Sequence, residues 1–280
     1  MFFHKNRLVR CVYSLPVLIV YFISFMNMVF LHKGYLDQNP QDDYAMIKCL
    51  IVYFATITGV IALTKTAITE PGEVPLQFDL LEESFKESLN TEDYGIERYH
   101  ATVTYCRKCD RNRPVRAHHC ILCNKCIMRM DHHCPWVGNC VGIYNYRTFV
   151  QLVLYAWIST SFVAGACGEI LLREDGQTDN WNFAGFVVSW ALFVMTAMLT
   201  VYHLWMICEN SNTIELTFHK HYNLFNFGSL TNFQQIFGPP GLHYILPIEF
   251  SLNPEAGFIY PIKLENLKGE TVYFTNKVLI

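Results

Sequence analysis

The chain has 280 residues, a formal net charge of −3 and 52% hydrophobic residues. A net charge this close to zero says little about partners, because the distribution of charges matters more than their sum. The mean hydropathy is above zero even with the polar segments included. A purely soluble protein is therefore a poor expectation, and the first question is whether the chain spans a membrane.

The N-terminal segment carries Lys5, Arg7 and Arg10 and leads into an almost wholly apolar run at residues 11–31. About 20 such residues are enough to cross a bilayer. A cleaved signal peptide would have a shorter apolar region and a small-residue cleavage site, and we find neither. We therefore expect a first transmembrane helix that is retained.

Three more apolar runs follow at residues 46–63, 148–172 and 183–208. The alternative for each run is a buried helix of a soluble protein. Four such runs in one chain make that alternative a poor explanation, so we expect four transmembrane helices.

Lysine and arginine set the expected orientation, because cytosolic loops carry an excess of both. The two connectors at 32–43 and 173–182 hold only Lys33 and Arg173, and nearly all other basic residues lie at the N-terminus, at 65–147 and in the tail. Both termini and the 65–147 segment are therefore predicted to face the cytosol. That compartment is reducing, which suits free thiols and bound zinc.

Residues 106–140 concentrate seven of the 11 cysteines and four of the 11 histidines. Paired C-x2-C spacing with interspersed histidines is typical of zinc sites, and each closed structural site needs four ligands. Two zinc ions would use eight of these 11 candidates and leave three over. The alternative is a set of buried free thiols or disulfides.

The sequence Asp131-His132-His133-Cys134, followed by PWVGNC, resembles the signature of the DHHC protein S-acyltransferases (palmitoyltransferases), and the preceding Cys and His spacing fits as well. The resemblance implies an all-α integral membrane protein. Four transmembrane helices would carry a small cytosolic zinc-stabilised cysteine-rich domain of short β-hairpins. The expected divisions are 1–65 (helices 1 and 2), 66–147 (cytosolic, core 104–147), 148–208 (helices 3 and 4) and 209–280 (cytosolic tail).

The resemblance also implies two interleaved zinc sites, a pairing that spacing alone does not assign. One site would comprise Cys106, Cys109, His119 and Cys126. The other would comprise Cys120, Cys123, His133 and Cys140. His118, His132 and Cys134 remain, with Asp131 beside them.

These remaining residues suit nucleophilic catalysis. A thiolate is the reactive form of cysteine and is activated by a neighbouring base. Cys134 is the expected nucleophile, His132 its base, and Asp131 the group that orients His132. The alternative for Asp131 is a turn cap or a partner of a zinc-bound histidine, and His118 is expected to be structural.

Basic residues gather on the same stretch, and we expect five of them to contact the phosphates of coenzyme A: Arg107, Lys108, Arg116, Lys125 and Arg129. The alternative is the cytosolic bias of basic residues together with attraction to anionic lipids. Nucleic-acid binding is a poor explanation next to membrane helices.

Shorter motifs flank this stretch. Glu70-Pro71-Gly72 resembles the family's Asp-Pro-Gly motif but is best explained as a turn that ends a helix. Asn212-Thr213-Ile214-Glu215 resembles its Thr-Thr-x-Glu motif, which implies that Thr213 bonds Asp131; the alternative is an N-cap or a turn. Asn232 resembles a residue that satisfies buried backbone groups, and residues 80–89 are expected to form a short amphipathic helix.

The resemblance implies an enzyme that moves a palmitoyl group from acyl-coenzyme A to protein cysteines through a thioester on Cys134. It would hold two structural Zn²⁺ and no redox cofactor. Its partners would be acyl-coenzyme A, membrane lipids and protein substrates at the cytosolic face, with no nucleic acid. We expect a Golgi or endoplasmic reticulum membrane, with the plasma membrane as the alternative. A non-catalytic zinc scaffold and a zinc hydrolase are the rival functions; the hydrolase needs an open zinc position.

Overall fold

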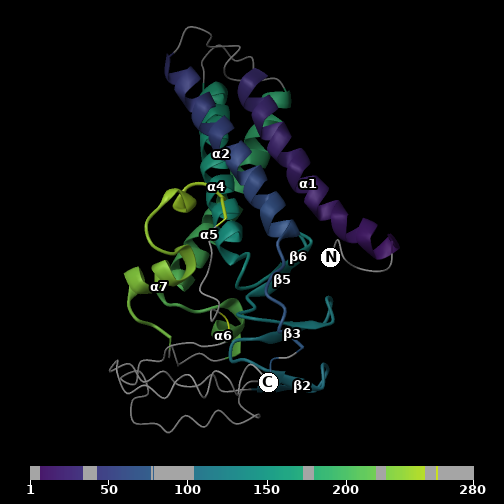
Figure 1. Cartoon of the computed structure of the whole chain (residues 1–280). Helices are drawn as coiled ribbons and strands as arrows, with labels where there is room; N and C mark the ends of the chain where they lie inside the picture. The colour runs from purple at the N-terminus through teal and green to yellow at the C-terminus, as the bar shows by residue number, and fades with distance from the viewer. Residues whose placement is uncertain are drawn as a thin grey trace.

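The computed structural model describes residues 7–33, 43–76, 78, 104–172, 180–218, 225–249 and 257. Within these residues, four long helices form a bundle, and small β-hairpins and short helices gather at one end of it (Figure 1). The long helices are α1 (Arg7–Leu31), α2 (Asp43–Ile68), α4 (Tyr146–Leu171) and α5 (Asn180–Cys208). The predicted helix at 80–89 lies outside the described residues.

Three of these helices are long and apolar enough to cross a membrane: α2, α4 and residues 183–208 of α5. A 26-residue helix such as α4 is about 39 Å long at 1.5 Å per residue, which exceeds the roughly 30 Å of a hydrocarbon core. The apolar stretch in the described part of α1 runs only from Leu15 to Val29. Three candidate spans are therefore observed, and the fourth stays a prediction that depends on α1.

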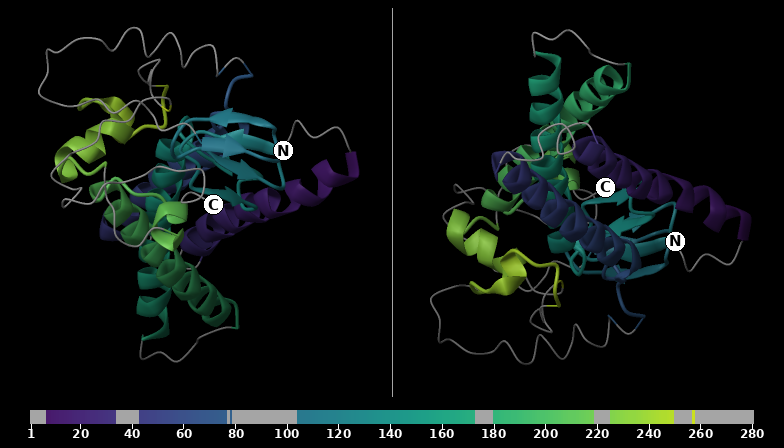
Figure 2. Two further views of the ribbon diagram at one scale, coloured as in Figure 1. Left: turned by 90° about the horizontal axis from the view of Figure 1, so that it is seen from below. Right: turned by 90° about the horizontal axis from the view of Figure 1, so that it is seen from above.

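Helix α4 lies at the centre of the bundle and packs against both α2 and α5, while α1 packs against α2 and α4 (Figure 2). The helices α2 and α4 approach closely at Gly59, where an added Cβ would lie 3.3 Å from the Cβ of Tyr155. Nearby, the hydroxyls of Thr56 and Ser159 form a 2.8 Å hydrogen bond between these helices. Small and hydroxyl residues of this kind hold membrane helices together, because they permit close approach and satisfy each other in the absence of water.

The cysteine-rich segment folds into three antiparallel hairpins, each with two strands of three residues. They are β1–β2 (Thr104–Cys106, Arg111–Arg113), β3–β4 (His118–Cys120, Lys125–Ile127) and β5–β6 (His132–Cys134, Asn139–Val141). Hairpin β5–β6 lies nearest the helices and β1–β2 farthest from them (Figure 1). Pairs of strands this short are not stable alone, so other interactions must hold them.

Two asparagines fasten the third hairpin to the end of α2. Asn139 Nδ2 donates to the carbonyls of Thr66, Ala67 and Thr69, at 3.2, 3.2 and 2.8 Å. Asn145 Nδ2 donates to Thr66 O and to Cys140 O. The last carbonyls of a helix have no partner within it. These amides supply partners and thereby fix the hairpin at the end of the bundle.

The chain continues after α5 into two short helices, α6 (Thr213–Phe218) and α7 (Ser229–Phe237), and a 3₁₀ turn, η2 (Leu242–Tyr244). Helix α7 packs against α5 and α4. Ile236 and Phe237 of α7 join the buried cluster that contains Cys134 and Phe149. Segments far apart in the sequence thus meet around the third hairpin.

Candidate active site

The three hairpins share one turn geometry. Four residues separate the paired strands in each, and the fourth has a positive φ: 53° at Asp110, 54° at Asn124 and 62° at Gly138. Asn, Asp and Gly are the residues that adopt this left-handed conformation most readily. The repeat places Cys106, Cys120 and Cys134 at the same position, the last residue of the first strand.

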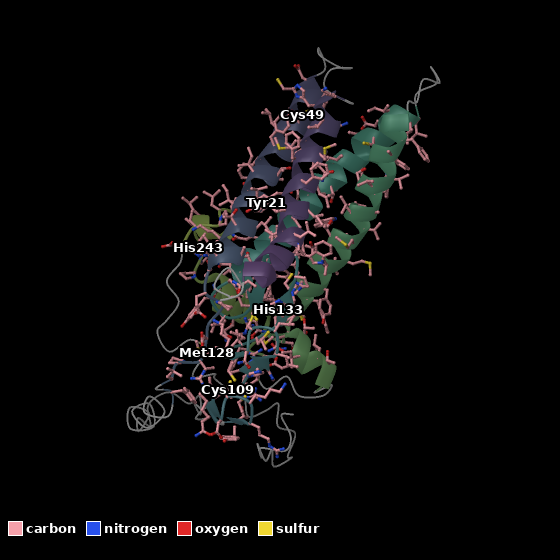
Figure 3. The ribbon with its side chains drawn as sticks, turned by 90° about the vertical axis from the view of Figure 1, so that its right-hand side faces the viewer. Tyr21, Cys49, Cys109, Met128, His133 and His243 are labelled. Atoms are coloured by element: carbon pink, nitrogen blue, oxygen red, sulfur yellow. The ribbon has the colours of Figure 1, made fainter. Side chains whose placement is uncertain are left out.

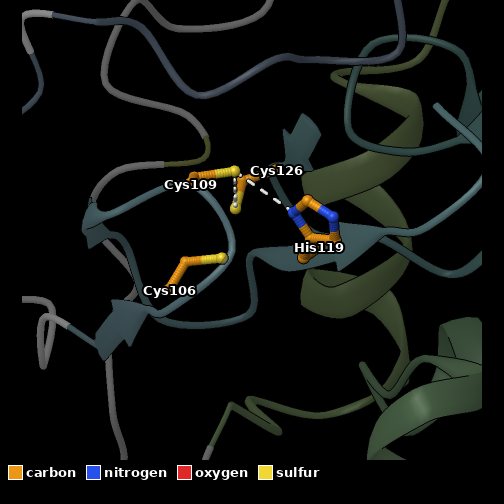
Figure 4. A group of neighbouring side chains, drawn as sticks. All are labelled: Cys106, Cys109, His119 and Cys126. Atoms are coloured by element: carbon orange, nitrogen blue, oxygen red, sulfur yellow. Dashed lines mark hydrogen bonds between the residues drawn. The ribbon is translucent and has the colours of Figure 1, made fainter. Parts of the chain in front are cut away.

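The first metal cluster joins two hairpins. Cys106 and Cys109 come from β1 and its turn, and His119 and Cys126 form a cross-strand pair of β3–β4 (Figure 4). The Sγ of Cys109 lies 3.1 Å from Nδ1 of His119 and 3.6 Å from Sγ of Cys126. The four ligand atoms all lie within 4.8 Å of one another.

The second cluster repeats this arrangement one hairpin further along. Cys120 and Cys123 come from β3 and its turn, and His133 and Cys140 form a cross-strand pair of β5–β6. Nδ1 of His133 lies 3.6, 3.5 and 3.4 Å from the sulfurs of Cys120, Cys123 and Cys140. The middle hairpin therefore contributes to both clusters, which is why the two ligand sets interleave in the sequence.

Both clusters fit a zinc ion. A tetrahedral ion with Zn–S bonds of about 2.3 Å and Zn–N bonds of about 2.0 Å places its ligand atoms roughly 3.5–3.8 Å apart, close to the distances found here. Each cluster offers four protein ligands, as a closed structural site does. All ten cysteines that the structure describes are free thiols, so the disulfide alternative is wrong for them.

The third hairpin departs from the repeat at one side chain. Where the first two hairpins carry Cys109 and Cys123, the third carries Val137. Val137 is fully buried and packs in the same cluster as Cys134. Cys134 therefore occupies a metal-ligand position in the fold but has no C-x2-C partner, and it belongs to neither metal cluster.

Asp131 and His132 lie three and two residues before this thiol. Asp131 is 1% exposed, and its carboxylate accepts three hydrogen bonds: from His132 Nδ1 at 2.6 Å, and from the backbone N–H and Oγ1 of Thr213 at 2.9 Å each. Because a carboxylate only accepts, Nδ1 of His132 carries the proton, and Nε2 is the nitrogen left to exchange protons. This is the arrangement of a base oriented by a carboxylate.

The charges of the pair stabilise each other. Burial lowers the pKa of His132, but the hydrogen bond and charge of Asp131, together with the Cys134 thiol, outweigh it and raise the pKa to about 9. Burial likewise raises the pKa of Asp131, but hydrogen bonds from His132 and Thr213 lower it overall. The pair therefore favours an imidazolium next to a carboxylate, which is the state that stabilises a neighbouring thiolate.

Aromatic rings close the site on the membrane side. The ring of Phe149 in α4 stands edge-on to His132, with centroids 5.2 Å apart. His203 of α5 is buried next to both rings and lies 3.2 Å from the hydroxyl of Tyr146 through Nδ1. His203 therefore faces the interior of the bundle, and its contact with Tyr146 is a structural one.

Helix α6 is held to the hairpins by a second network besides Thr213. Arg116 is 3% exposed and binds Glu215 through two nitrogens, at 2.6 and 2.9 Å. It also donates to Oδ1 and to the backbone carbonyl of Asn210, and Arg129 donates to the same Oδ1 at 3.0 Å. Arg116 and Glu215 therefore fix the position of the helix that binds Asp131.

The five residues expected to bind coenzyme A do not lie together as one exposed set. The guanidinium groups of Arg116 and Arg129 are buried in the network around Asn210. Lys125 pairs with Glu73 at 2.8 Å. Arg107 and Lys108 are exposed, in the turn of the first hairpin. Arg116 donates to Glu215 and Asn210, and Arg129 donates to Asn210, so these donors are bonded within the protein. Coenzyme A binding by the five residues stays a prediction.

Asn232 lies where the resemblance implies. It is fully buried, and its Nδ2 donates to Cys208 O at 2.6 Å while its Oδ1 accepts from Phe227 N at 2.9 Å. The sequence reasoning missed Asn139, Asn145 and Asn210, which connect the hairpins to α2 and to the C-terminal helices. Isolated asparagines carry no spacing signal, so only the contacts reveal their role.

The comparisons with known proteins agree with this geometry. Residues 100–220 match the family model described as DHHC palmitoyltransferase. The probable protein S-acyltransferase 13 of Arabidopsis thaliana is 32% identical over 222 residues, covering 73% of this chain and 70% of that protein. Human palmitoyltransferase ZDHHC20 is 35% identical over 188 residues, covering 63% of this chain and 51% of that protein, so this match spans about half of its length.

Human palmitoyltransferase ZDHHC2 is 29% identical over 290 aligned positions, which cover 91% of this chain and 77% of that protein. The long match to this relative includes the helices as well as the hairpins. With two four-ligand Cys/His clusters, Cys134 as the hairpin cysteine outside them and the DHHC tetrapeptide in place, the chain belongs to the DHHC palmitoyltransferase family of protein S-acyltransferases.

Proposed function

We propose that this chain transfers a long-chain acyl group from acyl-coenzyme A to cysteine thiols of membrane-associated proteins, through a thioester on Cys134. The single observation that carries this proposal is the position of Cys134. It occupies the place of a zinc ligand in a repeated hairpin, lacks the second cysteine of the pair, and lies next to the Asp131–His132 pair.

The proposed first half-reaction forms the acyl-enzyme. The Cys134 thiolate attacks the thioester carbonyl of the donor, the carbon–sulfur bond to coenzyme A breaks, and the leaving thiolate takes a proton from His132. In the second half, a substrate cysteine gives its proton to His132 and attacks the acyl carbon. The bond to Cys134 breaks, and the free enzyme is restored.

Asp131 supports both steps from its buried position. Its three hydrogen bonds hold it as a carboxylate, and it keeps the His132 ring in the tautomer and orientation that proton transfer requires. Two zinc ions, held by the two four-residue clusters, would fix the hairpins that present these groups. Because each cluster already offers four ligands, neither suits the open catalytic zinc that a hydrolase needs.

The placement beside the helices supports a lipid donor. Cys134 is buried in a cluster with Val137, Phe149, Val153 and Ile207, at the end of the helix bundle. A fatty acyl chain gains about 0.8 kcal/mol for each CH₂ that it buries, so we place the chain among the helices and the coenzyme on the side of the hairpins. Exposed Arg107 and Lys108 are the basic residues that we assign to its phosphates.

The proposed location follows from the same arrangement. With the hairpins and both termini in the cytosol, the thiol would face the cytosolic surface of an endomembrane such as the Golgi or the endoplasmic reticulum. The basic residues of the N-terminus and of the segment 65–147 support this orientation. α1 would serve as the fourth span.

The test replaces one thiol. Purified Cys134→Ser should take up no labelled acyl chain in a hydroxylamine-sensitive bond from palmitoyl-coenzyme A, and should keep about two zinc ions per chain, the content of two closed sites. Cys208→Ser, a free thiol at the end of α5, is the matched control and should load normally. Hydroxylamine-sensitive labelling of Cys134→Ser would contradict the proposal, and normal metal content without loading in the wild-type chain would favour a zinc scaffold.

A further inference from the structure

Helix α4 carries a ladder of polar side chains inside a stretch long and apolar enough to span a membrane. Arg147, Gln151 and Tyr155 are spaced four residues apart, so they lie on one face of the helix. Gln151 is 1% exposed. Buried polar groups at membrane depth are costly unless they have partners, so the partners of this ladder explain its presence.

The partners are backbone carbonyls of the segment that follows α7. Arg147 donates to His243 O at 2.9 Å and to Ile248 O at 2.7 Å. Tyr155 donates to Ile245 O at 2.5 Å. Gln151 Nε2 lies 2.9–3.3 Å from three carbonyls: those of His243, Tyr244 and Leu246. The three side chains therefore donate hydrogen bonds to five carbonyls of a segment that is not an α-helix.

Four N–H groups of this segment donate to carbonyls within it or directly before it. Tyr244 N donates to Gly241 O, Ile245 N and Leu246 N donate to Leu242 O, and Ile248 N donates to Leu246 O, all within 3.1 Å. The residue between the last two is Pro247, which has no N–H. A loop in water does not require this much internal pairing, because water supplies the missing partners. A loop in hydrocarbon does require it.

The segment lies alongside the helices rather than beside the hairpins. Figure 3 places His243 against the bundle, on the helix side of His133, Met128 and Cys109. Tyr155 is nine residues from the start of α4 at Tyr146, about 13 Å along the helix axis at 1.5 Å per residue. Its side chain leans back toward the helix start, so Ile245 O lies within the first two turns or so of the span.

The outward face of the segment is apolar. Leu242, Ile245 and Ile248 are 69%, 54% and 42% exposed. The surface continues onto α2: the ring of Phe54, itself 50% exposed, stands edge-on to Tyr155 with centroids 6.1 Å apart. Exposed apolar side chains on a candidate span face lipid, and those of the segment extend the same surface.

We propose that residues 242–248 form a non-helical segment inserted into the cytosolic leaflet, where lipid acyl chains cover Leu242, Ile245 and Ile248. The α4 ladder makes this insertion possible by supplying hydrogen bonds to carbonyls that lipid cannot satisfy. Tyr244 also packs against Phe237 and Phe233 of α7. The inserted segment thereby anchors the helix that borders the Cys134 cluster.

The experiment measures depth in the full-length chain reconstituted into phosphatidylcholine vesicles. A fluorescent non-canonical residue replaces Ile245, and its quenching is compared for lipids spin-labelled on the acyl chain and for aqueous iodide. Two isoleucines serve as matched positions: Ile57 of α2, 54% exposed on a span, and Ile121 in the turn of β3–β4, 74% exposed. We expect Ile245 to behave like Ile57, with several-fold stronger lipid quenching and several-fold weaker iodide quenching than Ile121.

Quenching by iodide to the extent seen at Ile121 would overturn the proposal. Protection from both quenchers that grows with the protein-to-lipid ratio would overturn it too, because the surface would then pair two copies of the chain.

A second variant tests the ladder: Gln151→Leu should shift the Ile245 probe from lipid toward iodide quenching. Thr200→Val, which removes a 3.2 Å contact from α5 to α4, should leave the probe unchanged. Equal lipid quenching with and without Gln151 would sink the role of the ladder, and the wild-type measurement stands even if Gln151→Leu does not fold.

Discussion

The second and third hairpins have nearly the same backbone but different chemistry. In β3–β4, His119 pairs with Cys126 and Cys120 ends the first strand; in β5–β6, His133 pairs with Cys140 and Cys134 ends the first strand. The difference is the third residue of the turn, which is Cys123 in one hairpin and Val137 in the other.

In the proposed function, that difference separates a pair of metal ligands from the catalytic thiol. Cys120 and Cys123 form a four-ligand cluster with the next hairpin that could hold a metal, whereas the described residues contain no further hairpin beyond the third. Val137 turns inward to the helices instead. If Cys134 is the nucleophile that we propose, a fold that repeats a zinc-binding hairpin presents it in a rigid position by omitting one ligand.

Removing a ligand from the second hairpin should have the largest effect. Cys120→Ala leaves the second cluster with three ligands, and the apparent binding free energy of a structural zinc, about 10–16 kcal/mol in small zinc-binding peptides, is also folding free energy. We expect one metal fewer per chain, aggregation in detergent and no acyl loading. Metal analysis and size-exclusion chromatography measure this, with Cys134→Ser as the control that keeps its metals and elutes normally.

Full metal content in Cys120→Ala would contradict the assignment of the second cluster. Loss of one metal with all three hairpins still folded would contradict the view that metal, rather than strand pairing, holds the hairpins.

Changing the carboxylate of the third hairpin should affect the rate and leave the metals in place. Asp131→Asn keeps the shape of the side chain but can present an amide to His132 and favour the wrong tautomer, which costs on the order of 10²- to 10⁴-fold in comparable sites. Single-turnover acyl loading measures the rate. Thr213→Val removes one of the three hydrogen bonds to Asp131 and should cause a smaller loss. A metal-depleted Asp131→Asn would assign Asp131 to the zinc site instead.

Restoring the missing cysteine should convert the third hairpin toward the second. Val137→Cys recreates a C-x2-C pair with Cys134, so a disulfide or an added metal becomes accessible to the nucleophile. We expect acyl loading to fall after mild oxidation and to recover with dithiothreitol. Val137→Ala is the control: it opens a small cavity at a buried position and should lower stability by about 1–3 kcal/mol without redox-sensitive loading. Redox-independent loading by Val137→Cys would show that the two turns differ by more than this side chain.

The smallest effect is expected at the contact between the hairpins and α6. Arg116→Lys loses the bidentate bond to Glu215 and the bonds to Asn210, which should lower the free energy of unfolding by about 1–3 kcal/mol. Thermal unfolding in detergent measures it. The exposed Lys108→Ala is the control and should weaken coenzyme A binding without changing stability. If Arg116→Lys lost affinity for coenzyme A with no change in thermal unfolding, Arg116 would belong to the coenzyme A site after all.

Much of the site is readable in the sequence because it depends on local spacing. The C-x2-C pairs, the tetrapeptide at 131–134 and the apolar runs are contiguous features. They predict the candidate metal ligands and three of the four long helices as spans, and the family resemblance adds how the ligands are divided between the two clusters. The apolar run expected at 148–172, for example, is α4 at Tyr146–Leu171. The first helix illustrates the limit, because the apolar stretch described in α1 is shorter than the run at 11–31.

Other parts depend on contacts between residues far apart in the chain. Basic residues at 116 and 129 look the same in the sequence as those at 107 and 108, yet two are buried around Asn210 and two are exposed. Local composition cannot distinguish them, because the partners Asn210 and Glu215 come from the segment after α5. The same holds for Asn139 and Gln151. Their partners are backbone carbonyls, which every residue has, so residue types do not reveal them.

The amino-acid sequence by itself therefore determined which cysteines and histidines are spaced as metal ligands, where the DHHC tetrapeptide lies, and which segments are apolar enough to enter a bilayer. Only the tertiary structure decided which charged side chains are paired in the interior, how the third hairpin is bonded to α2, and where the segment after α7 lies. The physical reason is the distance along the chain over which each signal acts. Ligand spacing and hydropathy act over a few neighbouring residues, whereas the burial of a charge or a carbonyl depends on which distant segment packs against it.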